Sequence, residues 1–283
     1  MNLSRKNYLK YNEYGNISKL YFFHKYLMRI LDYSSLNKNN FMDLTIVYQC
    51  NADTNLFDSF GDIYEKSFPD KDEREPYGNI RFRTFSDYSA YGNYPATICC
   101  FLTEEQKPVG GMICDYYLSE TEDDTIDIEI IYLMVDKQYR NQGAGTYLMT
   151  TGLEEVIKEL TSTGLSVRNI YLETENPDKV ETSVIDPEIR IKFFKKLGFK
   201  EIKMNYMQPP LSETREWMDK LILMVLDNDQ SRHIKRTDLE EFLKLFYKGL
   251  GVEESRFYKS LEEELDKSQI KKHDSLDFVL KLK

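Results

Sequence analysis

Cysteine, histidine and tryptophan are scarce in this chain of 283 residues, which has four cysteines, three histidines and one tryptophan. The cysteines form no C-x-x-C pair and the histidines stand far apart, so the sequence has no spacing typical of a zinc site. Cys99 and Cys100 are adjacent in an expected strand, where neighbouring side chains point to opposite faces, so a disulfide between them is not expected. We predict no metal, and thiols that are buried or half-buried in a reducing compartment.

An excess of positive charge is also missing. The chain has 38 Lys and Arg against 48 Asp and Glu, a formal net charge of -10. General affinity for nucleic acid requires a basic face, so we expect no nucleic-acid partner. An acidic surface instead favours the approach of cationic partners such as amines.

Long apolar runs are missing as well. No run approaches the roughly 18 apolar residues that a membrane span needs. The stretch YFFHKYLMRIL is interrupted by His24, Lys25 and Arg29, so it does not resemble the apolar core of a signal peptide. We therefore expect a cytoplasmic protein with no membrane partner. The amphipathic stretch 17–32 is predicted to pack on the protein, and a helix lying on a membrane surface is the alternative.

Strands and helices alternate from Phe41 onward. Helices are expected over 55–68, from about 146 to 160, and from Asp186 to Gly198, where Asp186 is the N-cap, Pro187 lies in the first turn and Gly198 ends the helix. Apolar stretches between these helices predict strands over 44–50, 95–103, 110–118, 127–135, 169–175, 199–207 and 220–228.

From about Ser231 the sequence becomes helical in pattern. TDLE at 237–240 is a capping box that predicts a helix start at Thr237, and a second helix is expected around Phe257. The tail LDFVLKL fits either a strand or a helix. We predict three parts: an N-terminal arm with a short helix, a main domain, and a helical extension packed on that domain, over 1–41, 42–230 and 231–283.

The stretch RNQGAGTYL, residues 140–148, follows the apolar run IIYLMV and opens an expected helix. It lacks the lysine of a Walker A loop, and Leu148 stands where a dinucleotide fingerprint needs its third glycine. It does fit the pattern [QR]-x-x-G-x-[GA]. Small residues at 143–145 let a diphosphate approach the backbone amides at the helix start, where the helix dipole favours an anion. The alternative is a strand-to-helix turn that merely requires glycine.

Two further motifs follow this turn in order. After IIYLMVDKQYRNQGAG come IYLETEN and IRIKFFKKLGFKEI, and PVGGMI precedes all three at 108–113. With these motifs, the chain from about residue 42 to 228 resembles the GNAT superfamily of acyl-CoA-dependent N-acyltransferases. The resemblance implies an α/β (α+β) fold with a mixed, curved central sheet, flanked by helices and splayed open between its fourth and fifth strands.

The resemblance also implies where acetyl-CoA binds. Its pantetheine would lie in the split and hydrogen-bond to the backbone of 133–135, with the thioester carbonyl polarised by an amide near Val135. Its pyrophosphate would rest on the amides of 142–146. Asn176 matches a position that often contacts the cofactor or its bound water. The expected cofactor-binding residues are Leu133, Met134, Val135, Arg140, Asn141, Gln142, Gly143, Ala144, Gly145, Thr146, Asn176 and Phe194.

The proton acceptor for the amine is expected to be Glu129. It precedes Arg140 by eleven positions, the spacing of the general-base glutamate in the histone-modifying branch of the family. A carboxyl group within an apolar strand has a raised pKa if it is buried, which suits a base. The alternative is an acid on the solvated face of the strand. Asp127 is a second candidate, and Glu173 and Glu175 could act through water.

The acid for the leaving thiolate departs from the family pattern. Many members have tyrosine four residues before the glycine of the LGF motif, where this chain has Phe194. Phenylalanine cannot donate a proton, so we expect Phe194 to pack at the sulfur end of the cofactor. Tyr132 and Tyr206 are the candidate acids, and water is the alternative.

We therefore predict an N-acyltransferase that moves an acetyl group from acetyl-CoA directly to a primary amine of a small molecule or a peptide. The acceptor site would be built from the tyrosine-rich segment 77–94 and from 204–211, although these aromatic residues could simply pack. A homodimer is left open. The alternatives are a non-catalytic acyl-CoA-binding module and a GNAT-like shell without cofactor.

Overall fold

The computed structural model describes residues 42–48, 54–69, 74–86, 95–180, 185–211, 217–227, 234–251, 271–272 and 278–280. The predicted N-terminal arm, the second C-terminal helix and Cys50 lie outside these ranges.

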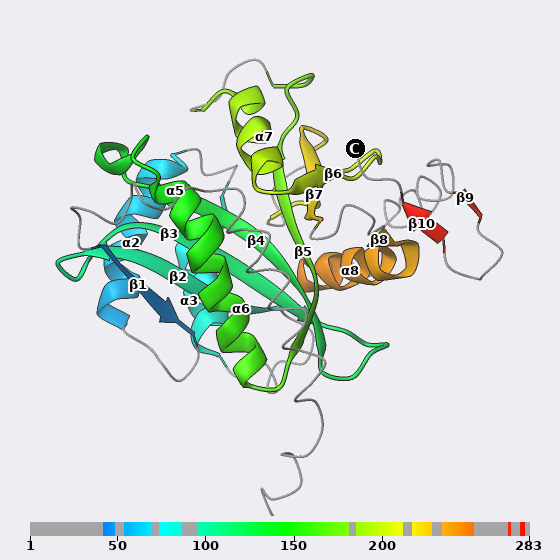
Figure 1. The fold of residues 1–283 in the computed structure, drawn as a ribbon, viewed down its shortest axis with the longest axis horizontal. Coiled ribbons are helices and arrows are strands. Elements are labelled where there is room, and N and C mark those ends of the chain that lie inside the picture. Colours follow the sequence, from blue (N-terminus) through cyan, green and yellow to red (C-terminus); the bar gives the residue numbers. More distant parts are fainter. Residues whose placement is uncertain are drawn as a thin grey trace, which may run out of the picture.

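Within the described residues, seven strands form one mixed sheet in the order β1-β2-β3-β4-β5-β7-β6 (Figure 1). Only β4 and β5 pair in parallel, and the other neighbours are antiparallel. The strand β2, ATICCFLTE, is buried at eight successive positions because helices cover both faces of the sheet. The strands are β1 Met42–Val47, β2 Ala96–Glu104, β3 Lys107–Leu118, β4 Thr125–Val135, β5 Ser166–Glu175, β6 Phe199–Glu201 and β7 Leu221–Leu226.

The strands β4 and β5 pair along only part of their length. Their ladder runs from the Thr125–Ser166 pair to the Ile130–Leu172 pair. Beyond it, β4 stays with β3 as far as Val135, whereas β5 pairs with β7 as far as Glu175. The sheet therefore opens between its fourth and fifth strands, which confirms the predicted splayed GNAT-like architecture.

A β-bulge interrupts β4 just where the opening begins. Consecutive residues of β3, Ile113 and Cys114, face Tyr132 and Ile130 of β4, so Ile131 is an extra residue. Asp115 of β3 faces Glu129. Strict alternation would place Glu129 and Tyr132 on opposite faces of the sheet, but the bulge brings both to the same face.

Helices cover both faces of the sheet (Figure 1). The helices α2 (Thr54–Ser67) and α3 (Tyr77–Phe85) pack on the face that carries Cys99. On the opposite face, α5 (Ala144–Tyr147) continues through one π-helical turn into α6 (Leu153–Ser162). This helix buries an apolar stripe at helical spacing, which includes Leu153, Val156, Ile157 and Leu160.

The start and stop signals of α7 (Pro187–Lys196) are where the sequence placed them. Asp186 is the N-cap, and its carboxylate accepts a hydrogen bond of 2.9 Å from the backbone N–H of Glu188. Pro187 is the first helical residue. Gly198 follows the helix with φ of +92°, a left-handed conformation that favours glycine.

The helix α8 (Arg236–Gly249) lies on the same sheet face as α2, over β3 and β5. The ring of Phe242 stacks on Tyr171 with centroids 3.9 Å apart, and it meets the edge of Tyr117 at 5.6 Å. The short strand β8 (Ile234–Lys235) precedes α8 and pairs with β10 (Phe278–Leu280), which also pairs with β9 (Lys271–Lys272).

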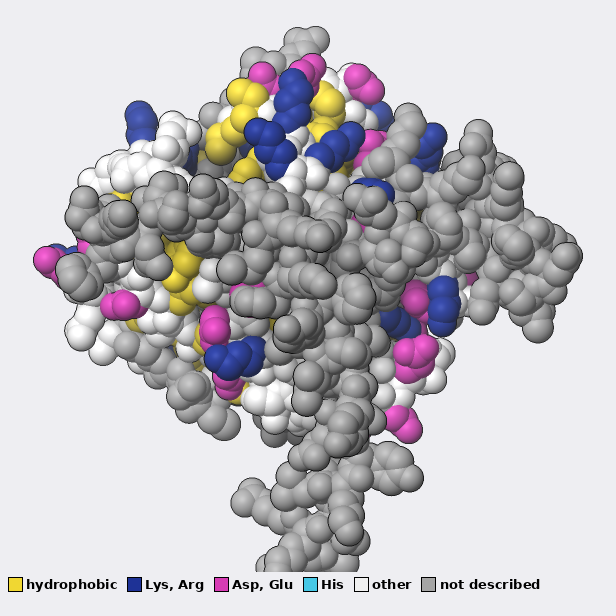
Figure 2. All heavy atoms as spheres, in the orientation of Figure 1, with side chains coloured by type: hydrophobic (Ala, Val, Ile, Leu, Met, Phe, Trp, Pro, Cys, Tyr) yellow, Lys and Arg dark blue, Asp and Glu magenta, His cyan; other side chains and the backbone are white. Residues whose placement is uncertain are grey.

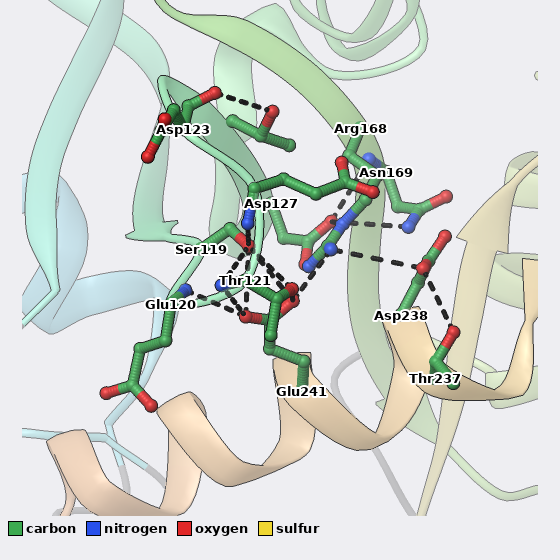
Figure 3. Close-up of polar contacts among 12 residues, drawn as sticks. Ser119, Glu120, Thr121, Asp123, Asp127, Arg168, Asn169, Thr237, Asp238 and Glu241 are labelled. Atoms are coloured by element: carbon green, nitrogen blue, oxygen red, sulfur yellow. Dashed lines mark hydrogen bonds and ion pairs between the residues drawn. The ribbon is translucent and has the colours of Figure 1, made fainter.

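Arg168 of β5 links α8 to the sheet (Figure 3). Its guanidinium contacts both carboxylate oxygens of Asp127, at 3.2 and 2.5 Å, and reaches Glu241 of α8 at 2.7 Å. Glu241 also accepts hydrogen bonds from the backbone N–H groups of Glu120 and Thr121. Asp127 is fully buried, and burial raises its pKa to about 6 in spite of Arg168. One buried ion cluster thus joins β4, β5, α8 and the loop after β3.

Two predictions of local structure were wrong. The helix α8 starts at Arg236 with no side-chain cap, so Thr237 lies inside the first turn rather than at a capping box. Glu240, expected to close that box, pairs with Arg236 instead. The predicted strand 199–207 ends at Glu201. Ile202 still donates to the carbonyl of Leu223 in β7, at 3.0 Å, and an isolated bridge joins Gln208 to Met218.

Of the four cysteines, Cys99, Cys100 and Cys114 lie in the described residues, where each is a free, buried thiol. Cys99 and Cys100 belong to different core clusters on opposite faces of the sheet, as expected. In the described part of the chain, no helix is both long enough and apolar enough to cross a bilayer.

Candidate active site

A cavity of about 570 Å3 lies where β4 and β5 separate. Its walls come from β3, β4 and β5, from Lys179 and Val180, from residues within 208–211 and 218–221, and from the last turn of α8. Apolar side chains make up part of the lining: Phe68, Pro95, Ile131, Leu211, Met218, Leu221, Phe246 and Leu250. The remaining lining is strongly charged, which is uncommon for a surface taken out of water.

Arg83 binds two of the carboxyl groups in the cavity wall. Its guanidinium makes two bonds of 2.7 Å to Glu75 and lies 3.0 Å from Asp115. Thr97 accepts a hydrogen bond from Arg83 and donates a very short one to Asp115. Two carboxyl groups thus share one positive charge, and burial raises the pKa of Asp115.

Two further cations in the cavity wall also form ion pairs. Arg190 of α7 lies 3.1 Å from the Glu175 carboxylate, and Lys179 lies 2.9 Å from Asp219. The sequence-predicted alternative base Glu175 is therefore bound in an ion pair. Asp127, the other alternative, is held by Arg168 in the buried cluster beneath α8.

Glu129 and Glu173 are different, because neither forms an ion pair with any Lys or Arg that the structure describes. Tyr117 donates a hydrogen bond of 2.9 Å to Glu129. Glu173 accepts one from Gln208 at 2.6 Å and a very short one from the hydroxyl of Tyr206. Both carboxyl groups line the cavity. Burial raises the pKa of Glu129 well above its usual value, with Glu173 adding to the rise, and burial raises the pKa of Glu173 to about 7.

Tyr132 and Tyr206, the two candidate acids, have different surroundings. Tyr132 lines the cavity, and its hydroxyl oxygen accepts a hydrogen bond of 3.1 Å from the backbone N–H of Glu75. Its hydroxyl also interacts with that of Tyr64, and burial raises the pKa of Tyr132. Tyr206 is 3% exposed and directs its hydroxyl to Glu173. Geometry thus favours Tyr132 as a donor into the cavity and Tyr206 as a support for Glu173.

The predicted anion cradle is a compact turn between β4 and α5. Asn141 and Gly143 have φ of +60° and +84°, and Gly143 is the N-cap of α5. The guanidinium of Arg140 folds back so that its Nε donates to the carbonyl of Val135 at 2.8 Å, and Gln142 donates to the carbonyl of Gln138. The turn thus holds itself in shape by its own side chains.

The space around the cradle is defined by Gly145 and α7. A Cβ atom built on Gly145 would have only the ring of Phe193 within 4 Å, at 3.8 Å. Phe194 instead packs its ring in the core, 6.0 Å from that of Phe199, and is 6% exposed. The structure thus brings Phe193, rather than Phe194, beside the cradle, and the predicted contact of Phe194 with the cofactor stays a prediction.

Basic side chains gather on the outer surface near α7, at the top of the view in Figure 2, among exposed apolar ones. The helix exposes Lys192, Lys195 and Lys196 together with Ile189, which is 59% exposed. This surface adjoins the cradle through Phe193. It concentrates positive charge near the cradle in a chain that is acidic overall.

Asn176 follows β5, and its side-chain oxygen accepts a hydrogen bond of 3.0 Å from the backbone N–H of Asp178. This bond shapes the turn that carries Lys179 into the cavity wall. Tyr77, within the expected acceptor segment, stacks on Phe57 and donates to the Phe57 carbonyl. It is a packing residue, whereas the tyrosines of 87–94 lie outside the described residues.

Several site residues were missed from the sequence. Glu75, Arg83 and Asp115 stand in three different elements, and no local pattern brings them together. Tyr117, which donates to Glu129, also carries no signal of its own, whereas Gln208, which donates to Glu173, lies within the predicted acceptor segment 204–211. A weak signal did exist for Asp115, since a carboxylate in the apolar strand GGMICDYYL is unusual in the way that Glu129 is.

The splayed sheet, the glycine turn and the cavity are together in one half of the molecule, and comparison with known proteins places this arrangement in a family. The model of the acetyltransferase (GNAT) family matches residues 56–199, about half of the chain. The chain belongs to this family. The matched GNAT region contains β2 to β5 and α7 and ends at the first residue of β6, whereas β1, β7 and α8 lie outside it.

Solved GNAT structures are distant from this chain. The ribosomal-protein-S18-alanine N-acetyltransferase of Escherichia coli is 19% identical, covers 68% of this chain and 100% of its own, and has a TM-score of 0.39. Arabidopsis thaliana NAA60 in complex with acetyl-CoA is 13% identical, covers 65% of this chain and 97% of its own, and has a TM-score of 0.44. An aminoglycoside acetyltransferase from an uncultured soil metagenomic sample, in complex with sisomicin, is 17% identical, covers 55% of this chain and 86% of its own, and has a TM-score of 0.38. No curated protein matches the sequence.

Proposed function

We propose that this GNAT protein transfers an acetyl group from acetyl-CoA to a primary amine by direct attack of the amine on the thioester. The observation that supports this proposal most strongly is the cavity at the β4–β5 opening. Among the described residues, it combines two carboxyl groups without ion-pair partners, Glu129 and Glu173, with the tyrosine Tyr132 in its lining. Proton transfer is the part of the reaction for which the protein must supply side chains.

The residues present fit acetyl-CoA. At the start of the α5–α6 helix, the first backbone N–H groups have no acceptor within the helix, so they can bind a pyrophosphate. The left-handed Gly143 and the open space beside Gly145 let that anion approach the backbone closely. Arg140 uses one of its five N–H donors on Val135 and keeps others for a phosphate oxygen. When bound, acetyl-CoA would supply a thioester carbonyl next to the cavity.

Each of the chain's own groups would have a separate task. The backbone between Leu133 and Val135, which β5 no longer pairs with, would bind the pantetheine and polarise the carbonyl. The carboxyl pair Glu129 and Glu173 would take the proton from the amine. The hydroxyl of Tyr132 would protonate the departing thiolate, a task for which Phe194 has no suitable atom.

The acceptor would be a small amine or an amine-bearing peptide. A protonated amine is attracted to carboxylates in a cavity of low dielectric, where it can lose its proton before attack. A second candidate function, a non-catalytic acyl-CoA-binding module, is favoured by one observation. Phe194 lies in the core at the position where many relatives carry the tyrosine acid.

Two measurements test the proposal. Thermal unfolding with and without acetyl-CoA tests binding: a ligand at about 100 times its Kd stabilises the folded state by about 2.7 kcal/mol, a shift of several degrees in Tm. Thiol release in the presence of a panel of primary amines tests turnover. Binding without thiol release from any amine would support the non-catalytic module, and no shift at millimolar acetyl-CoA would contradict both functions.

A further inference from the structure

We propose that Glu173 on β5, rather than Glu129 on β4, takes the proton from the acceptor amine, while Glu129 stays a neutral carboxylic acid. This inference rests on the proposed N-acetyltransferase function and states which of the two carboxyl groups accepts the proton. It contradicts the sequence-based expectation that Glu129 is the base.

The register of the sheet places the two carboxyl groups together. Glu129 pairs with Tyr171 across the parallel ladder, and Glu173 is two residues further along β5, on the same face as Tyr171. Glu173 therefore lies diagonally ahead of Glu129, toward the opening. Both side chains line the same cavity.

Neither group has a cation to balance it among the described residues, so the pair is unfavourable as two carboxylates. Two like charges in the same buried cavity repel each other, so one carboxyl group keeps its proton near neutral pH. The nearest guanidinium, on Arg83, is already bound to Glu75 and Asp115. The pair thus holds one negative charge.

Hydrogen-bond donors decide which member holds that charge. Glu173 accepts from the Tyr206 hydroxyl and from the amide of Gln208, one donor to each carboxylate oxygen. Glu129 accepts from Tyr117 at one oxygen. Donors stabilise a carboxylate over a carboxylic acid, so the charge resides on Glu173 and the proton on Glu129.

The titratable groups around the pair also favour a protonated Glu129 and an ionised Glu173. Glu129 faces Asp115 and Tyr117 of β3, Glu173 of β5 and, more weakly, Arg83 of α3; burial and the two acids raise its pKa well above its usual value. Glu173 faces Glu129, Tyr206 and, from α8, Tyr247. Its pKa of about 7 suits a base that works near neutral pH.

The proton balance of the reaction follows. The amine nitrogen forms the C–N bond with its lone pair, and the electrons of the C–S bond leave on sulfur. The proton lost from nitrogen goes to Glu173, and sulfur takes a proton from the Tyr132 hydroxyl. Exchange with water then removes the proton from Glu173 and restores the one on Tyr132, so amide and free thiol are the net products.

The test is the pH dependence of kcat for the full chain and for Glu173→Gln, Glu129→Gln and Tyr206→Phe, with Glu105→Gln as a control. Glu105 is exposed in the β2–β3 turn, away from the cavity. For the unaltered protein, kcat should fall below pH about 7 as Glu173 becomes protonated. E173Q should lower kcat by about 100-fold or more and abolish this fall of kcat at acidic pH, the acidic limb of the pH profile.

E129Q should keep the acidic limb, since it replaces one neutral group by another. Y206F should move the limb to higher pH, because removing a donor destabilises the carboxylate; mere structural damage would lower kcat without moving the limb. If E129Q abolishes the limb and E173Q preserves it, the assignment is reversed and our inference is wrong.

An infrared measurement locates the proton without any turnover. At a pH near 8.5, the unaltered protein should show the C=O band of a protonated carboxyl group, and E129Q should lose that band while E105Q keeps it. A band that survives in E129Q would overturn the inference. Absence of thiol release from the unaltered protein with every amine tested would count against the proposed function instead, and the infrared result would still report which carboxyl is protonated.

Discussion

Replacing Arg168 by methionine would leave a buried carboxylate without its partner, and the cost of this change can be worked out from the structure. Asp127 is fully buried, and the side chain of Arg168 is 7% exposed. Removing one partner from such a pair costs about 3–5 kcal/mol. Glu241 loses the same cation, so the contact between α8 and the sheet weakens as well. Against a total stability of about 5–15 kcal/mol, this loss is large.

Urea unfolding followed by circular dichroism measures the effect. A matched control is Lys192→Met, which breaks an exposed pair with Glu188 whose side chains are 69% and 64% exposed, and it should leave the stability nearly unchanged. The loss in R168M should be smaller at pH 5 than at pH 8, because Asp127 can then bind a proton. Adding Asp127→Asn to R168M should restore part of the stability. A loss in R168M no larger than that of the control, or no recovery in the double variant, would refute this reasoning.

Two further predictions concern the cradle and the cavity. Gly143→Glu should abolish acetyl-CoA binding by bulk and by repulsion of the diphosphate. The control Gly164→Glu changes another left-handed glycine, with φ of +98° and open space around it, so it should lose a similar amount of stability and still bind acetyl-CoA. Calorimetric titration of both variants measures this, and equal binding by the two would contradict the assignment of the cradle. The pKa of Glu173 rises on folding from 4.5 to about 7, so the stability that this group contributes is complete below pH about 4.5 and declines as pH rises to about 7, by on the order of 3 kcal/mol. Urea midpoints at pH 5 and pH 8 should therefore differ more for the unaltered protein than for Glu173→Gln, and an equal difference would contradict the pKa.

The sequence was most informative where the physics is local. Asp186, Pro187 and Gly198 marked both ends of α7 because capping and left-handed turns depend on neighbouring residues alone. The glycine turn before α5 was visible for the same reason. The family motifs then predicted the splayed sheet, which no single element could indicate.

Tertiary contacts were not predictable in this way. Thr237 has the chemistry of a cap, but the helix begins one residue earlier, where Lys235 still belongs to the extended strand β8. Glu129 was correctly singled out as a carboxyl in an apolar strand, yet its state depends on Glu173 and on their unequal donors. Gln208, one of those donors, lies just beyond the predicted strand 199–207, in the segment 204–211 that was assigned to the acceptor site without a role for this residue.

The bulge at Ile131 has a consequence for how this region of the chain tolerates change in length. The bulge shifts the register of β4 against β3 by one residue, between the part of β4 that pairs Glu129 with Asp115 and the part that pairs Tyr132 with Ile113. One residue that pairs with nothing across the ladder thus allows an acid and a hydroxyl, three positions apart, to face the same cavity. A regular strand of the present length would turn one of them into the opposite core, beneath α6. Deleting Ile131 would leave Glu129 and Tyr132 two positions apart and still on one face, so the deletion should change the local bend and twist of β4 rather than the face to which either group points.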